Sequence, residues 1–149
     1  MTESATRLNV SIEIPVAPES VWAVMADVEH WHEWTQSVRS ARLFGTGPLA
    51  VGSRVLMRQP GVLPTVWTVQ TLTPNRGFIW TTGIPGLLHV VASHCVEPTP
   101  QGSRASLSLK FGGMLGRVVA KRSEDRNRRY LRLEVEGLKQ ASTATRRSS

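Results

Sequence analysis

The stretch LNVSIEIPVAPESVWAVMADVEHWHEW, residues 8–34, contains three short segments with different hydrophobic periods. In residues 8–14 apolar and polar side chains alternate, which predicts a strand with one buried face. Pro18 then stands at a favourable position for the start of a helix. Apolar side chains follow it at helical spacing: Val21, Trp22, Met25 and Val28. The chain therefore opens with a strand and a short amphipathic helix.

The last eight residues of that stretch, DVEHWHEW at 27–34, predict a second short helix. Asp27 is a residue type that can cap its start. Val28, Trp31 and Trp34 recur every three residues, so on a helix they form one apolar side. We interpret this segment as a brace that packs against the rest of the fold.

The same eight residues also raise the question of a metal site. His30 and His32 lie about 200° apart on a helix, so they cannot bind one ion together. Glu29, His32 and Glu33 share the side opposite to the tryptophans, where they form either a solvated face or an exposed site without an evident fourth ligand. The solvated face is the favoured alternative, and no metal is predicted.

Residues 36–111 read as six consecutive antiparallel strands. The clearest alternation is in residues 104–111, and turn signals separate the runs: 45–48, Gly61, 74–77, 85–86 and 98–102. Gly112 and Gly113 end this pattern. Residues 114–140 hold no proline and two glycines, Gly116 and Gly137, so they predict one long helix. The architecture is one strand, two short helices, six strands and one long terminal helix.

Composition and charge limit the functional classes. The chain has 149 residues and 40% hydrophobic content, which fits one domain, expected at residues 8–140 between a flexible start (1–7) and a disordered tail (141–149). No apolar run is long enough to span a membrane and no signal peptide is evident, so a cytoplasmic location is expected. Of the 18 basic residues, 10 lie in residues 117–149 with 4 acidic ones. The basic character therefore belongs to the C-terminal segment.

Several local motifs in this order resemble those of the START and birch-pollen-allergen-like superfamily, in its polyketide cyclase/dehydrase branch. The resemblance covers about residues 8–140. The motifs are Ile14–Trp22, Asp27-Val28 with Trp31 and Trp34, Gly52–Val55, His94 ahead of Val96–Pro98, Gly102–Ala105 and Gly137–Lys139. Each is weak alone, and together they indicate the fold rather than an activity.

The resemblance implies an α+β helix-grip fold, in which a curved seven-stranded antiparallel sheet wraps around the long C-terminal helix and leaves an internal cavity. Members of the superfamily hold lipids, sterols, plant hormones or polyketides there, and some cyclise or dehydrate them. In this chain the expected apolar cavity wall consists of Met57, Trp67, Trp80, Leu107, Leu109 and Phe111.

His94 is the most informative polar residue among the strands. It shares its side of the strand with apolar residues: Leu88, Val90, Ala92 and Val96. An imidazole on that side needs a polar partner. Three roles stay open: a core histidine satisfied by a hydrogen bond, a ligand contact, or proton transfer.

The terminal helix has apolar ends and a polar middle, residues 121–129. An apolar stripe along the helix would cross that middle at about positions 122, 125 or 126, and 129. We expect an inward residue among Arg122, Asp125 and Arg126, either in a structural ion pair or as the anchor of a carboxylate or phenolate head group. Tyr130 is expected to help orient the ligand.

The sequence therefore predicts a protein that binds or transports a hydrophobic small molecule, without a cofactor. The alternative is a cofactor-independent cyclase or dehydratase, with His94, Tyr130 and Arg126 as candidate catalytic residues. The basic helix adds the prospect of weak docking to an anionic membrane, whereas no nucleic-acid motif is present. Ligand identity and oligomeric state are not predicted.

Overall fold

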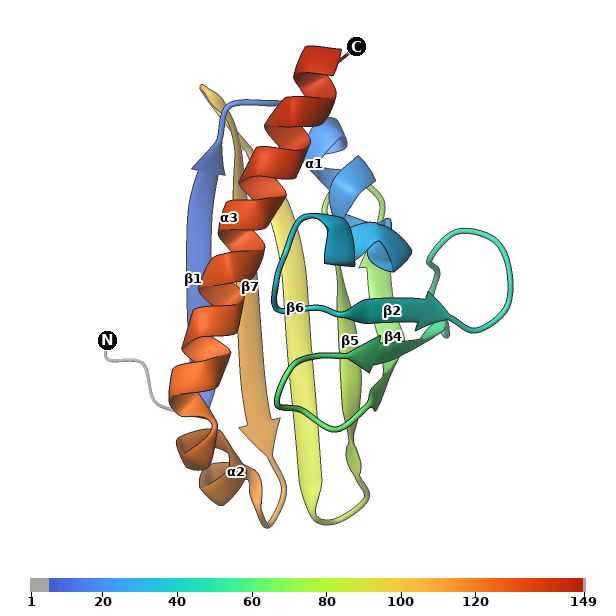
Figure 1. Cartoon of the computed structure of the whole chain (residues 1–149), viewed down its shortest axis with the longest axis vertical. Coiled ribbons are helices and arrows are strands. Elements are labelled where there is room, and N and C mark those ends of the chain that lie inside the picture. The colour runs from blue at the N-terminus through green and yellow to red at the C-terminus, as the bar shows by residue number, and fades with distance from the viewer. Residues whose placement is uncertain (1–5, 149) are drawn as a thin grey trace.

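The computed structural model describes residues 6–148, and the side chains of residues 6–144 (Figure 1). The chain begins with β1 (Arg7–Ile14), α1 (Pro18–Met25) and the 3₁₀ helix η1 (Val28–Glu33). Six strands and two helices follow: β2 (Ser40–Leu43), β3 (Arg54–Arg58), β4 (Thr65–Thr73), β5 (Gly77–Ile84), β6 (Leu88–Thr99), β7 (Gly102–Gly112), α2 (Gly116–Arg122) and α3 (Glu124–Ser148). Most of the predicted flexible start lies outside the described residues, and Arg7 already belongs to β1.

All seven strands form one antiparallel sheet in the order β1-β7-β6-β5-β4-β3-β2. The first strand thus pairs with the last, with Leu8 opposite Leu109 and Val10 opposite Leu107. Figure 1 shows α3 lying along the face of the sheet over β1 and β7. The predicted α+β helix-grip fold is confirmed.

The two short helices cap one end of the sheet. Pro18 occupies the first turn of α1, where Val21 and Met25 are buried. The segment after Asp27 is a 3₁₀ helix, whose three residues per turn align Val28, Trp31 and Trp34 on one side. Asp27 makes no capping bond, because its carboxylate instead accepts a hydrogen bond from His30 Nδ1 at 2.8 Å.

The C-terminal helix differs from the prediction in two respects. It is not continuous from residue 114: α2 starts at Gly116 and ends at Ser123, whose hydroxyl donates to the Val119 carbonyl, and α3 follows. At its other end α3 runs to Ser148, so residues 141–148 are helical rather than a disordered tail. The helix continues past residue 140 because one side still packs there, as the fully buried Ser142 shows.

The core has two parts. The larger part joins the short helices to the sheet through an aromatic cluster of Trp31, Phe78 and Trp80, with ring centroids 5.1–6.4 Å apart. Trp31 is fixed there by a hydrogen bond from its Nε1 to the Met25 carbonyl at 3.0 Å. The smaller part packs α3 onto β1 and β7 and consists of Leu8, Leu107, Leu131 and Val135.

One glycine sets how closely α3 approaches the short helices. A Cβ placed on Gly137 would lie 2.1 Å from the Trp34 carbonyl oxygen and 2.9 Å from Cε3 of its ring. No side chain fits between the two backbones. Gly137 therefore allows a helix-to-helix contact that any other residue would push apart.

We predict that Gly137→Ala destabilises the fold by about 1–3 kcal/mol, the usual cost of overpacking, although alanine favours a helix by about 1 kcal/mol. Chemical denaturation of both proteins measures the difference. Gly112→Ala is the control, because a Cβ there meets nothing closer than 3.9 Å. Equal unfolding free energies for Gly137→Ala and the parent chain would contradict the close approach.

Candidate functional site

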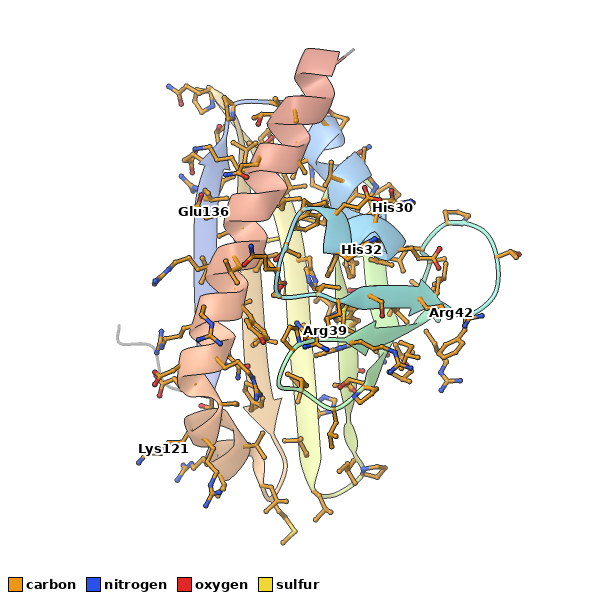
Figure 2. All side chains as sticks on the ribbon, in the orientation of Figure 1. His30, His32, Arg39, Arg42, Lys121 and Glu136 are labelled. Carbon is orange, nitrogen blue, oxygen red and sulfur yellow. The ribbon has the colours of Figure 1, made fainter. Side chains whose placement is uncertain are left out.

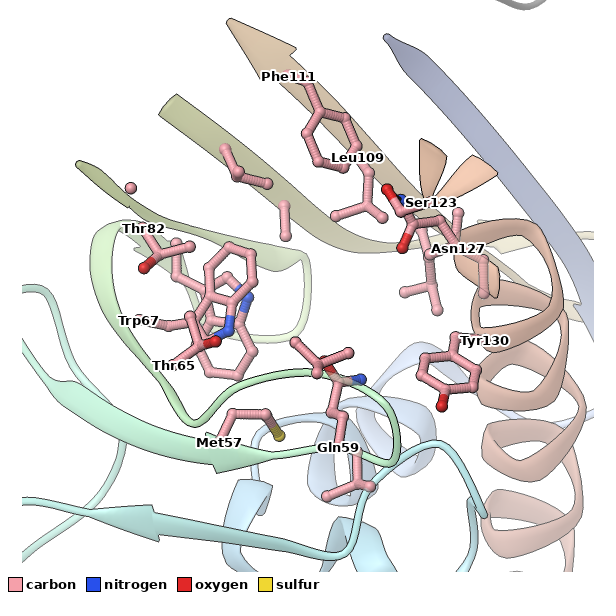
Figure 3. A pocket seen from close by; sticks show the side chains of 18 of the residues that line it. Met57, Gln59, Thr65, Trp67, Thr82, Leu109, Phe111, Ser123, Asn127 and Tyr130 are labelled. Carbon is pink, nitrogen blue, oxygen red and sulfur yellow. Dashed lines mark hydrogen bonds between the residues drawn. The ribbon is translucent and has the colours of Figure 1, made fainter. Parts of the chain in front are cut away.

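A cavity of about 530 Å³ lies between the sheet, α3 and the loop that joins β3 to β4. All six residues expected in its apolar wall border it: Met57, Trp67, Trp80, Leu107, Leu109 and Phe111. Figure 3 shows Trp67 and Met57 on one side, Leu109 and Phe111 on another, and Asn127 and Tyr130 on the helix that closes the cavity. The volume is in the range of a small-molecule site.

Two tryptophans form the most extended flat surface of the wall. Trp67 on β4 and Trp80 on β5 stack with ring centroids 5.6 Å apart and planes 27° apart. The register places Val69 opposite Trp80, and a β-bulge follows between Val69 and Thr71. Offset rings of this kind offer an apolar face to a flat or aliphatic ligand.

His94 faces the cavity from β6 and is surrounded by aromatic rings. Its imidazole stacks on Phe78 with centroids 4.5 Å apart and an 11° interplanar angle, and Trp31 and Trp80 lie 5.3 Å away. The ring is buried, and its Nδ1 has no hydrogen-bond partner. Burial lowers the pKa of His94 to about 3, so the imidazole is neutral at physiological pH.

The polar middle of the terminal helix presents a different face from the expected one. Arg126 and Tyr130 line the cavity, whereas Arg122 and Asp125 are exposed and do not. The buried residues recur at helical spacing through Ala120, Ser123, Asn127 and Leu131, so the buried side of the helix passes through Ser123 and Asn127 instead of Arg122 and Asp125. Arg122 is therefore wrong as a cavity residue.

Arg126 and Tyr130 also hold the β3–β4 loop against α3. The Tyr130 hydroxyl donates a hydrogen bond to the Pro60 carbonyl, and Arg126 Nη1 donates to the Gly61 carbonyl at 3.1 Å. The Nε of Arg126 is buried without a partner, and no ion pair to Arg126 occurs in the described part of the chain. A cationic group with an unused donor therefore borders an apolar cavity.

Glu134 is the cavity residue that the sequence analysis missed. It lies two turns beyond Arg126 on α3, and its Oε2 accepts a hydrogen bond from Ser37 Oγ at 2.9 Å. Burial raises the pKa of this carboxyl to about 7, against a smaller lowering by the Ser37 hydrogen bond. Its helical spacing from Leu131 and Leu138 was a signal in the sequence that Glu134 lies on the buried side of the helix. A glutamate in a basic helix, however, is normally expected to face solvent.

The histidines near the start of the chain are not part of this site. Figure 2 shows His30 and His32 on η1, and His30 is paired with Asp27. Glu29 Oε2 accepts a hydrogen bond from the Leu43 backbone N–H at 3.1 Å. Among residues 6–148, no group of three or more His, Cys, Asp or Glu is placed to hold a metal ion.

Comparison with known proteins places the chain in a family. A family model described as polyketide cyclase/dehydrase and lipid transport matches residues 5–143. A search of curated proteins finds no match. Among solved structures, a protein of Nitrosomonas europaea has a TM-score of 0.74 at 16% identity, over 97% of this chain and 99% of that one. These values establish similarity of fold.

Two further solved structures are similar. A hypothetical protein of Helicobacter pylori has a TM-score of 0.75 at 15% identity and covers 91% of this chain and 86% of its own. The structure of Ara h 8.0201 has a TM-score of 0.64 at 9% identity, with 93% and 97% covered. Fold and family model agree: the chain belongs to the polyketide cyclase/dehydrase and lipid transport family, as its motifs predicted.

Proposed function

We propose that the protein binds or carries a hydrophobic small molecule with an acidic group, held in the cavity between the sheet and α3. One observation carries the proposal: an apolar, tryptophan-lined cavity of about 530 Å³ contains an arginine that no carboxylate of residues 6–144 pairs. Family membership supports hydrophobic ligand binding in general terms. The finer assignment rests on the chemistry of the lining residues.

Arg126 supports an acidic head group. Its Nε–H is buried and points at no acceptor, which costs free energy that a ligand carboxylate or phenolate would recover. A guanidinium presents its donors in a fork that matches a carboxylate. The apolar remainder of such a ligand would lie against Trp67 and Trp80, where burial contributes roughly 25 cal/mol per Å² of apolar surface.

Native mass spectrometry of protein taken directly from cells tests the proposal as a whole. We expect an additional mass that organic extraction releases as an apolar acid. A cavity filled by side chains, with no added mass and no binding of any apolar acid in titrations, would remove it.

A matched pair of probes tests the role of Arg126. We expect Arg126→Met to weaken decanoate binding roughly 10- to 100-fold, since hydrogen bonds to charged groups contribute about 1.5–3 kcal/mol. The methyl ester of decanoate should be affected much less. Quenching of tryptophan fluorescence measures both affinities, and Arg122→Met, which removes the same charge from an exposed position, is the control. Equal losses for acid and ester would contradict an ionic contact.

A cofactor-independent cyclase or dehydratase is the second candidate, with acid–base residues in the same cavity. The low pKa of His94 argues against this enzyme function, because so weak a base is almost never protonated near neutral pH. The Tyr130 hydroxyl is engaged with the β3–β4 loop. Conversion of a poly-β-ketone that is lost in His94→Ala or Tyr130→Phe, while binding persists, would favour the enzyme over the carrier.

A patch of exposed apolar side chains beside basic residues supports docking to an anionic membrane. Five exposed apolar side chains gather where the β5–β6 turn meets α2, joined by a hydrogen bond from Leu115 N to the Leu87 carbonyl at 2.8 Å. We call them the apolar tip: Ile84, Leu87, Met114, Leu115 and Val118. Exposed cations on α2 flank it, namely Arg117, Lys121 and Arg122, and residues 113–122 contain no carboxylate. Figure 2 shows Lys121 pointing outward from α2.

The apolar tip supports contact with a membrane surface rather than insertion. No helix in the described residues is long and apolar enough to cross a bilayer. Apolar side chains beside lysine and arginine instead suit the interface of an anionic leaflet, where each cation contributes about 1 kcal/mol. Ile84 also lines the cavity, so a docked molecule would bring its cavity close to the lipid.

We predict that the protein sediments with phosphatidylglycerol vesicles and not with phosphatidylcholine vesicles. Replacing Met114 and Val118 by serine should lower the bound fraction roughly tenfold, because two exposed apolar side chains no longer enter the interface. Val51→Ser is the control, since Val51 is equally exposed but lies in the β2–β3 loop. Binding that is independent of lipid charge, or unaffected by the double replacement, would contradict docking through this patch.

A further inference from the structure

Glu134 is a half-buried acid at the cavity that the proposed function does not use. Four titratable side chains line the cavity: His94 on β6, and Arg126, Tyr130 and Glu134 on α3. Glu134, like Arg126, has no ion-pair partner in the described residues. A carboxylate that is partly shielded from water and has no counter-charge lowers the stability of the fold. A role other than stability would explain its presence here.

A short hydrogen-bonded chain fixes one edge of this carboxyl. Ser37 Oγ donates to Glu134 Oε2 at 2.9 Å and lies 2.9 Å from Thr35 Oγ1. Thr35 Oγ1 also accepts from the Ser37 backbone N–H at 3.3 Å. Ser37 and Thr35 are buried, so this arrangement cannot rotate freely. The carboxyl is therefore oriented, with one oxygen occupied.

The other carboxylate oxygen still has acceptor capacity. An ionised carboxylate accepts about four hydrogen bonds, and the structure records one side-chain donor to this group, Ser37. Glu134 borders the cavity itself, next to the end closed by η1. The natural partner for the unused oxygen is a donor that arrives with the ligand.

We propose that Glu134 and Ser37 form a second polar subsite, at the end of the cavity near η1, that binds a hydrogen-bond donor of the ligand, a hydroxyl or a protonated amine. The inference rests on the proposed function and narrows its ligand class. Arg126 and Glu134 are eight residues apart on one helix, about 12 Å along its axis. The ligand is thus an elongated apolar molecule with an acidic group at one end and a donor at the other.

The charged and titratable groups around Glu134 are compatible with this assignment. On its own helix Tyr130 and Arg126 lie one and two turns away, and across the cavity His94 is neutral. From the loop after η1 the facing polar group is Ser37, which is uncharged. Desolvation is the main influence on the acid, so an arriving cation or hydroxyl would stabilise its ionised form.

Glu134→Gln tests the subsite with little change of shape. The glutamine amide carries no charge and has one acceptor oxygen in place of the two of the carboxylate, so a donor of the ligand should bind it more weakly. The probes are decylamine and 1-decanol, titrated by tryptophan fluorescence at pH 8 and pH 5.5. Glu136→Gln, on the exposed side of the same helix, is the matched control.

At pH 8 we expect decylamine or 1-decanol to bind the parent chain at least tenfold more tightly than Glu134→Gln. At pH 5.5, where the carboxyl holds a proton, the advantage of decylamine should fall below threefold. A loss confined to decylamine identifies an amine subsite, and a loss for 1-decanol identifies a hydroxyl subsite. If neither probe distinguishes Glu134→Gln from the parent chain, the proposal is overturned.

Decanoate separates this proposal from the one on which it rests. If decanoate binds through Arg126 while decylamine and 1-decanol bind the parent chain and Glu134→Gln equally well, the second subsite is wrong and the proposed function stands. If no probe binds at all, both fail. Ser37→Ala provides a second variant that keeps the carboxyl but frees its fixed oxygen, and we expect it to weaken donor binding about three- to tenfold.

A stability measurement checks the position of Glu134 without any ligand. Burial raises the pKa of this acid in the folded state, so the folded protein keeps a proton that the unfolded chain has released. Its contribution to stability therefore falls as pH rises from about 4.5 through 7. Thermal unfolding should show the parent chain losing stability relative to Glu134→Gln over that interval. Parallel curves would mean an accessible carboxyl and would overturn the subsite.

Discussion

The width of the sheet relative to a single helix is the constraint on which the site depends. Seven strands spaced about 4.8 Å apart span roughly 29 Å, whereas a helix with its side chains is about 10–12 Å wide. Here α3 covers β1 and β7 through the contacts of Leu131 and Val135. The short helices and Trp31 fill one end of the remaining space. The space that remains is the cavity, which residues of β3 to β7 and of α3 line.

The elements that close the cavity differ in how firmly they are held. At one end Gly137 permits direct backbone contact between α3 and Trp34, so no space remains between these two segments. Along the side the β3–β4 loop is held mainly by the hydrogen bonds of Tyr130 and Arg126 to its carbonyls. Breaking two hydrogen bonds costs far less than separating a packed core. A ligand would therefore enter past this loop more readily than past η1.

Strand positions could be predicted from the sequence because a period of two fixes which face each residue occupies. That parity placed His94 on the apolar face of its strand, and the family resemblance implied that this face borders a cavity. The helix was harder, because residues 121–129 contain no apolar side chain to mark the buried side, which passes through Ser123 and Asn127. Helical spacing places Glu134 beside Leu131 and Leu138, but its contact with Ser37 could not be predicted, because Ser37 is 97 residues away in the chain. The periodicity of the sequence predicts which face of a strand or helix a residue occupies. The hydrogen bonds and the pKa of that residue depend on contacts with residues far away in the chain.

Desolvation shifts the pKa values of two of the four titratable groups at the cavity, His94 and Glu134, in opposite directions. It keeps His94 uncharged over the whole physiological range, and it raises the pKa of Glu134 to about 7, so that this carboxyl is partly protonated near neutral pH. Arg126 stays charged throughout. In mildly acidic conditions the cavity therefore carries one positive charge and favours an anion. As pH rises through 7, Glu134 ionises, and the cavity becomes dipolar along α3. Under the proposed function, this dipole would orient a bound acid with its head at Arg126 and its far end toward Glu134.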